Sequence, residues 1–106
     1  MPEACTVFVR LIPLPGHREF TMSLIQELLT DIRAISGCEE YTLYDEVGGD
    51  LILHERWSSR HHWQAHFEAP PILRLKAELA DRVELAVERL ETYQVPRPQG
   101  RGSPRA

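Results

Sequence analysis

The sequence predicts a small α+β protein: a ferredoxin-like split β-α-β sandwich with an antiparallel sheet, if its last element is a strand. Three patterns support this class. Residues 4–12 are apolar and β-branched, as in a strand. Residues 17–35 carry apolar side chains at helical spacing, and residues 39–57 have the pattern of two strands joined by a glycine turn.

The first strand, 4–12, is followed by Pro13 and Pro15-Gly16, which end it. The helix over 17–35 comes next, and Gly37 is suited to end it because glycine readily adopts the left-handed conformation of a helix C-terminus. The apolar stripe of this helix consists of Phe20, Leu24, Leu28, Ile32 and Ile35.

The predicted hairpin joins strands 39–46 and 51–57 around Gly48-Gly49-Asp50. Successive side chains of a strand point to opposite faces, so each strand has two separate sets. Tyr41 and Tyr44 therefore lie on opposite faces of the first strand. In the second strand one face carries Leu51, Leu53, Glu55 and Trp57, and the other carries Ile52, His54 and Arg56.

Two further helices are predicted after the hairpin. Ser58-Ser59 offers an N-cap for a short helix that runs to His66 or Phe67, and Pro70-Pro71 fits the first turn of the next helix. The pattern over 83–94 is ambiguous: its periodicity slightly favours a helix, although Val83, Leu85 and Val87 also alternate as in a strand.

The chain has 106 residues and a net charge of −4, which predicts one acidic domain over residues 1–94. The remaining residues, 95–106, are rich in Pro, Gly and Arg and are predicted to be a disordered tail. Because the tail contains arginines but no acid, the acidic excess lies in the domain. This charge argues against nucleic acid as the main partner.

The termini and cysteines indicate where the protein acts. Cys5 and Cys38 do not make a disulfide framework. The N-terminus lacks the basic and apolar segments of a signal peptide, and no run approaches the ~20 apolar residues of a membrane span. We therefore expect a cytoplasmic protein with no membrane partner.

Residues 54–66, HERWSSRHHWQAH, hold four of the five histidines and both tryptophans. His62 and His66 could face one metal from a helix, but the Glu that follows the first His in zincins is absent. Because catalytic zinc needs three convergent ligands, no metal site is predicted, and His61 and His62 are expected to be solvated. Tryptophans are more often part of the core than of a cofactor site.

A series of short motifs resembles one known family. It consists of Pro15-Gly16 before the first helix, Gly37-Cys38-x-x-Tyr41, Glu55-x-Trp57-Ser58, and Ala65-His66 with a proline soon after. In order and spacing the series resembles the antibiotic biosynthesis monooxygenase domain, over residues 4 to about 94. The resemblance implies a fourth strand over 83–94 and a dimeric α/β barrel. A homodimer is also expected from the bare, partly apolar face of the predicted sheet.

The resemblance implies several activities. Members of the family include cofactor-free monooxygenases of phenolic or quinol-type polyketides, quinol oxidases, enzymes that act in isomerisation of small phosphorylated signals, and haem-degrading enzymes. The haem-degrading branch uses Asn, Trp and His at positions that correspond here to Val9, His66 and Lys76. Since all three differ, haem degradation is disfavoured.

Our hypothesis is a cofactor-independent monooxygenase that oxidises a small phenolic or quinol-type aromatic substrate with O₂. His66, which matches the recurrent His of the family's cavity, is the candidate base, and Glu55 could orient it or pair with an arginine. The candidate substrate-binding side chains are Trp57, Trp63, Tyr41 and His54. Two alternatives stay open: a non-catalytic dimeric module that binds a small ligand, and an isomerase acting on a small carbonyl compound.

Overall fold

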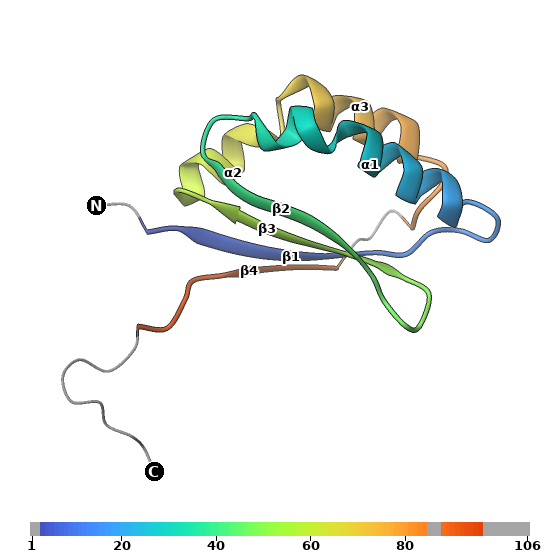
Figure 1. Cartoon of the computed structure of the whole chain (residues 1–106), viewed down its shortest axis with the longest axis horizontal. Helices are drawn as coiled ribbons and strands as arrows, with labels where there is room; N and C mark the ends of the chain where they lie inside the picture. Colours follow the sequence, from blue (N-terminus) through green and yellow to red (C-terminus); the bar gives the residue numbers. More distant parts are fainter. Residues whose placement is uncertain (1–2, 85–87, 97–106) are drawn as a thin grey trace, which may run out of the picture.

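A computed structural model describes residues 3–84 and 88–96 of the chain. Its four strands form one antiparallel sheet in the order β2-β3-β1-β4, and the three helices lie together on one face of this sheet (Figure 1). This is the predicted ferredoxin-like α+β fold. In chain order the elements are β1 (Cys5–Leu11), α1 (Arg18–Arg33), β2 (Cys38–Asp45), β3 (Leu51–Trp57), α2 (Arg60–His66), α3 (Pro70–Leu79) and β4 (Glu88–Thr92).

The last element is a strand, as the family resemblance implied. β4 pairs with β1 in antiparallel register, with Arg89 opposite Val9 and Leu90 opposite Phe8. The slight preference of the periodicity for a helix is therefore wrong over 88–92, because pairing with β1 outweighs local spacing. Residues 85–87 lie outside the described residues, and so do residues 97–106 of the expected disordered tail.

Local sequence signals explain where the elements begin and end. Gly37 follows α1 with a φ of 83°, the left-handed conformation predicted for it. Ser59 caps α2, since its Oγ accepts a hydrogen bond of 3.2 Å from the backbone N–H of His62. Pro70 and Pro71 occupy the first turn of α3, where no backbone donor is required.

The core lies between the helices and the covered face of the sheet. Strand alternation places Val7, Val9, Leu51 and Leu53 on this face, and all four are buried. They pack against the apolar stripes of the helices, which consist of Leu24, Ile25, Leu28 and Ile32 in α1 and Ile72, Leu75 and Leu79 in α3. No helix among the described residues is both long and apolar enough to cross a bilayer.

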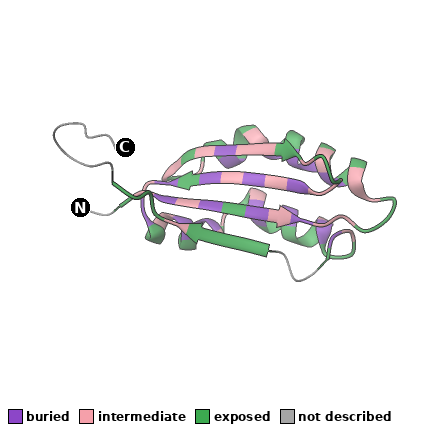
Figure 2. Cartoon of the chain, turned by 90° about the horizontal axis from the view of Figure 1, so that it is seen from below, coloured by how far each residue is buried: buried purple, intermediate pink, exposed green. Residues whose placement is uncertain are grey.

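Among the described residues, no helix covers the opposite face of the sheet (Figure 2). This face exposes several apolar side chains, as predicted. Phe8 of β1 and His54 of β3 stack on this face with ring centroids 5.0 Å apart. Phe8, Tyr44 and Leu90 are exposed by 38%, 52% and 58% respectively. Tyr41 is only 3% exposed and lies on the covered face, so the two tyrosines lie on opposite faces, as predicted.

Candidate active site

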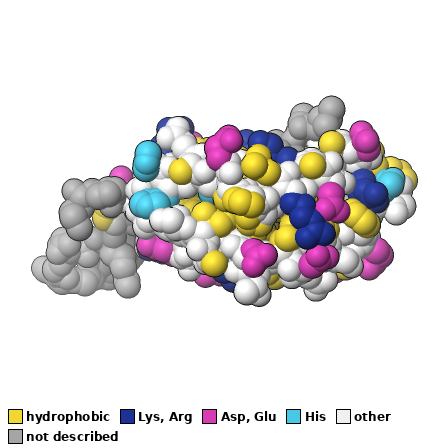
Figure 3. Space-filling model, turned by 90° about the horizontal axis from the view of Figure 1, so that it is seen from above, with side chains coloured by type: hydrophobic (Ala, Val, Ile, Leu, Met, Phe, Trp, Pro, Cys, Tyr) yellow, Lys and Arg dark blue, Asp and Glu magenta, His cyan; other side chains and the backbone are white. Residues whose placement is uncertain are grey.

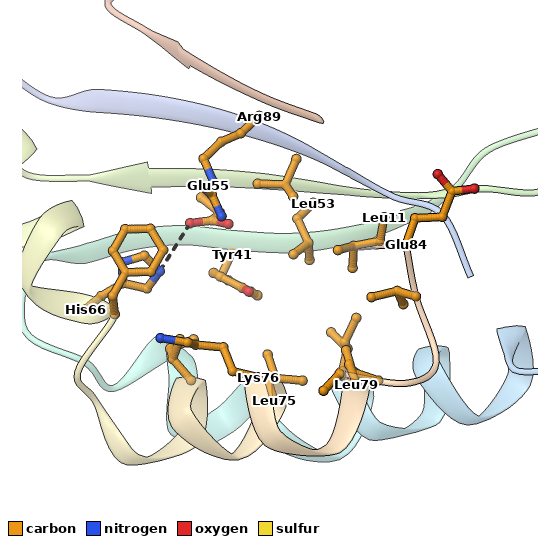
Figure 4. A pocket seen from close by; sticks show the side chains of 16 residues that line it. Leu11, Tyr41, Leu53, Glu55, His66, Leu75, Lys76, Leu79, Glu84 and Arg89 are labelled. Atoms are coloured by element: carbon orange, nitrogen blue, oxygen red, sulfur yellow. Dashed lines mark ion pairs between the residues drawn. The ribbon is translucent and has the colours of Figure 1, made fainter. Parts of the chain in front are cut away.

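A cavity of about 560 Å³ lies between the sheet, α2 and α3, within the usual range for a small-molecule site. Most of its wall is aliphatic and is made by Val9, Leu11, Ile25, Leu53, Ile72, Leu75, Leu79, Ala80 and Val83. Its other lining residues are Tyr41, Glu55, His66, Phe67, Lys76, Glu84 and Arg89. Most of these polar groups gather at the end near α2, while Glu84 lies at the far end (Figure 4).

His66 and Glu55 form a buried pair at the polar end of the cavity. His66 ends α2, and Glu55 points from the covered face of β3. Their side chains are each 4% exposed, and His66 Nε2 lies 3.8 Å from Glu55 Oε1 (Figure 4). This separation is too long for a hydrogen bond, so the Nε2 nitrogen stays available to a ligand.

Neighbouring groups determine how His66 presents its ring. The Nδ1–H group of His66 donates a hydrogen bond to the backbone carbonyl oxygen of Trp63, one turn earlier in α2. Since a carbonyl oxygen can only accept, Nδ1 carries the proton in the neutral ring, and Nε2 presents its lone pair to the cavity. The rings of Trp57 and Phe67 pack at centroid distances of 4.5 Å and 4.3 Å from the imidazole and restrict its rotation.

Burial shifts both titrating groups towards their neutral forms. Burial raises the pKa of Glu55 to about 7, against the opposing effects of a hydrogen bond from Trp57 and the charge of Arg89. Burial lowers the pKa of His66, and the charges of Arg89 and Lys76 lower it further, although its hydrogen bond to Trp63 acts in the opposite direction. Between the lowered pKa of His66 and about pH 7, both groups are therefore mainly uncharged, and His66 can act as a base.

Tyr41 presents a polar group to the same cavity from β2. Its side chain points into the cavity (Figure 4), and the residue is 3% exposed. Burial, followed by the nearby Glu55, raises the pKa of the Tyr41 hydroxyl, so this group stays protonated and can donate a hydrogen bond. Within the described part of the chain the hydroxyl has no hydrogen-bond partner, which is unusual for a buried polar group and indicates space for a polar ligand atom.

Two cationic residues at the cavity were not predicted as site residues. Arg89 extends from β4 towards Glu55, and Lys76 extends from α3 (Figure 4). Lys76 follows Leu75 at the edge of the apolar stripe of α3, and Arg89 continues the alternation that begins at Val83. These two patterns could have placed both residues beside the cavity. The cavity is also lined by the three positions that correspond to the residues of the haem-degrading branch, which are Val9, His66 and Lys76.

Three of the predicted substrate-binding residues do not line the cavity. Trp57 is fully buried, and its Nε1–H donates a 2.9 Å hydrogen bond to Glu55 Oε1. Trp63 packs edge-on against Phe67 at 5.4 Å. His54 lies on the uncovered face of the sheet, because strand alternation turns it away from Glu55. The structure thus places both tryptophans behind the catalytic candidates and His54 outside the site.

His62 is more constrained than a solvated histidine. Its Nδ1 lies 2.8 Å from Ser59 Oγ and 3.1 Å from Ser58 Oγ, and its ring packs over Gly37. His61 is exposed, and histidine side chains are visible on the surface at the α2 end of the molecule (Figure 3). Among residues 3–84 and 88–96, no three His, Cys, Asp or Glu side chains converge as metal ligands.

Comparison with known proteins agrees with this fold. The family model described as antibiotic biosynthesis monooxygenase matches residues 5–78, which include Glu55 and His66. Rv0793 of Mycobacterium tuberculosis, provisionally named a monooxygenase, is 33% identical over 82 residues, which cover 76% of this chain and 81% of that protein. In the structural comparison, the structure of Rv0793 is 28% identical and covers 92% of this chain and 100% of its own, with a TM-score of 0.81. PA3566 of Pseudomonas aeruginosa has the same fold, with a TM-score of 0.81 and 20% identity, and covers 91% of this chain and 98% of its own.

Proposed function

Because the chain belongs to the antibiotic biosynthesis monooxygenase family, as its sequence motifs suggested, we propose that it is a cofactor-independent monooxygenase. Its substrate is a small phenolic or quinol-type aromatic compound, which it oxidises with O₂. The observation that carries this proposal is the buried His66–Glu55 pair at the polar end of an otherwise mostly aliphatic cavity. This combination offers a base and a mostly apolar space for a flat ring.

In the first step His66 takes the proton of the substrate hydroxyl group. The lone pair of Nε2 faces the cavity because Nδ1 donates to the carbonyl of Trp63. The Tyr41 hydroxyl then donates a hydrogen bond to the resulting phenolate oxygen. Glu55, once ionised, stabilises the imidazolium that forms 3.8 Å away.

The phenolate itself supplies the electrons for the reaction. It passes one electron to O₂, which gives a substrate radical and superoxide. These recombine by forming a C–O bond at a ring carbon that bears hydrogen, and the peroxide receives the proton held by His66. Loss of the ring proton and cleavage of the O–O bond release water and leave a quinone, so one oxygen atom of O₂ enters the product.

Oxygen uptake with dihydroxynaphthalenes, anthrones and quinols tests this proposal. His66→Gln should lower kcat/KM by about 10²-fold or more, the usual contribution of a general base. His61→Gln is the matched control, because His61 is an exposed residue of the same helix. Equal uptake by the wild type and His66→Gln would contradict the assignment of the base.

Two other assays separate this reaction from the alternative functions. Full turnover of a substrate under nitrogen would assign an isomerase, because the same His66 and Glu55 can move protons without O₂. Tight binding of aromatic compounds with no turnover in air would assign a ligand-binding module.

We further propose that the protein is a homodimer that buries the uncovered face of the sheet. Phe8 and Leu90 are cross-strand neighbours on this face, and both are exposed in the single chain. Such a patch is typical of a protein–protein contact. Phe8→Asp should shift the sedimentation coefficient to that of a monomer, and a wild-type protein that sediments as a monomer at all concentrations would contradict the dimer.

A further inference from the structure

The polar end of the cavity has an excess of positive charge. Arg89 and Lys76 line it from opposite walls, the sheet and α3 (Figure 4). Within residues 3–84 and 88–96, neither side chain lies within ion-pair distance of a carboxylate. Some arginines elsewhere in the sheet and in α3 differ in this respect, since Arg56 pairs with Glu39, and Arg74 with Glu27 and Glu78.

Arg89 is oriented by a neighbouring ring, although no carboxylate of the described residues pairs with it. Its guanidinium lies 5.3 Å from the centroid of the Phe67 ring, and Phe67 also lines the cavity. Stacking on an aromatic ring orients a guanidinium and leaves its N–H groups free to bind a planar anion. Lys76 adds a second charge that can approach the same anion from α3.

The two cations lie close to the reacting groups. The charges of Arg89 and Lys76 both lower the pKa of His66, and the charge of Arg89 also lowers the pKa of Glu55. Arg89 and Lys76 also lie at the same end of the cavity as His66 and Glu55 (Figure 4), so an anion bound by these cations would lie near the His66 imidazole. Glu84 lies at the opposite end of the cavity, which makes that end unsuitable for an acidic group (Figure 4).

We propose that the substrate is a hydroxy-aromatic acid whose carboxylate, next to the reacting hydroxyl group, is bound by Arg89 and Lys76. This inference rests on the proposed function for the hydroxyl group and adds the acidic substituent. The carboxylate receives paired N–H donors from the guanidinium and a point charge from the ammonium group. The hydroxyl group then faces His66 and Tyr41, and the rings fill the aliphatic part of the cavity.

Anaerobic calorimetric titrations with 3-hydroxy-2-naphthoate and 3-hydroxy-2-naphthamide test this proposal. The two compounds have the same rings and hydroxyl group and differ in the charge of one substituent. At low salt the acid should bind about tenfold or more tightly than the amide, because the carboxylate forms charge-assisted hydrogen bonds with two cations and the amide does not. The preference should decrease as salt is added.

Variants that remove positive charge identify the residues responsible for the preference for the acid over the amide. Arg89→Gln/Lys76→Gln should bind the two compounds equally, whereas the control Arg56→Gln/Arg74→Gln removes the same charge elsewhere and should retain the preference. Arg89 and Lys76 are both exposed, so the double variant is expected to fold, which circular dichroism checks. Should it not fold, each single variant should still weaken the preference about threefold or more.

The outcomes separate this inference from the proposed function. Equal binding of acid and amide by the wild type, or a preference that survives in Arg89→Gln/Lys76→Gln, would overturn the acid-binding assignment. Preferential binding of the acid without oxygen uptake in air would support the acid-binding site and contradict the monooxygenase.

Discussion

Glu55→Gln should make the protein more stable at alkaline pH, although it removes a residue of the candidate active site. The pKa of Glu55 is raised by burial from 4.5 to about 7 in the folded protein. A raised carboxyl pKa means that the folded state favours the protonated form of Glu55. The contribution of protonated Glu55 to the stability of the folded protein is therefore fully present below pH 4.5. It is lost as pH rises through about 7, because ionisation is then easier in the unfolded chain.

The size of the effect follows from the shift. One pKa unit corresponds to about 1.4 kcal/mol, so a shift from 4.5 to about 7 corresponds to about 3 kcal/mol between pH 4.5 and pH 8. Glutamine has the same shape and no charge, and its side-chain oxygen can still accept the hydrogen bond from Trp57. For a domain of this size the melting temperature should change by roughly 10–20 °C relative to the wild type over this range.

Thermal unfolding of both proteins from pH 4.5 to pH 8, at one protein concentration, measures this difference. Glu55→Gln should gain stability over the wild type as pH rises, and Glu68→Gln should show no such trend, because Glu68 is exposed. A constant difference between Glu55→Gln and the wild type across this range would refute the argument that burial raises the pKa of Glu55.

Three further predictions concern catalysis and folding. In the wild type kcat/KM should rise as pH increases through about 7, because ionised Glu55 stabilises the His66 imidazolium, and Glu55→Gln should lose this rise in a pH–rate profile. Trp57→Phe removes a hydrogen bond that lowers the pKa of Glu55, so the rise should move to higher pH. Gly37→Ala should lower the free energy of unfolding by about 3 kcal/mol or more, since its φ is 83° and the added Cβ would lie 2.3 Å from His62 Cγ. Gly49→Ala, with a φ of 105° and open space, should cost only about 1–2 kcal/mol in the same denaturation assay.

The order of the elements and the faces of the strands could be predicted because they depend on local patterns. The hairpin register follows from the period of two, which placed Leu51, Leu53 and Glu55 on one face and His54 on the other. Gly37 and Pro70 marked helix boundaries by their own backbone preferences. The last strand had no clear local pattern, and the family motifs were needed to assign it.

The candidate site was only partly predictable from the sequence. Glu55 and His66 were predicted as site residues and both line the cavity, but Trp57 shares the face of Glu55 and still lies behind the cavity. Whether a side chain reaches the cavity depends on how far the helices cover its strand, and α2 covers this end of β3. The contribution of Arg89 likewise depends on the pairing of β4 with β1, which joins residues about eighty positions apart.

The sequence by itself thus determined the fold class and the alternation of the strands, and it supplied the two titrating candidates, since each follows from neighbouring residues or from a motif. Only the tertiary structure decided which groups meet. It brought Tyr41, Lys76 and Arg89 to the His66–Glu55 pair and left His54 on the other face. It also determined the protonation of the pair, because the pKa of Glu55 depends on burial by elements that are distant in the chain.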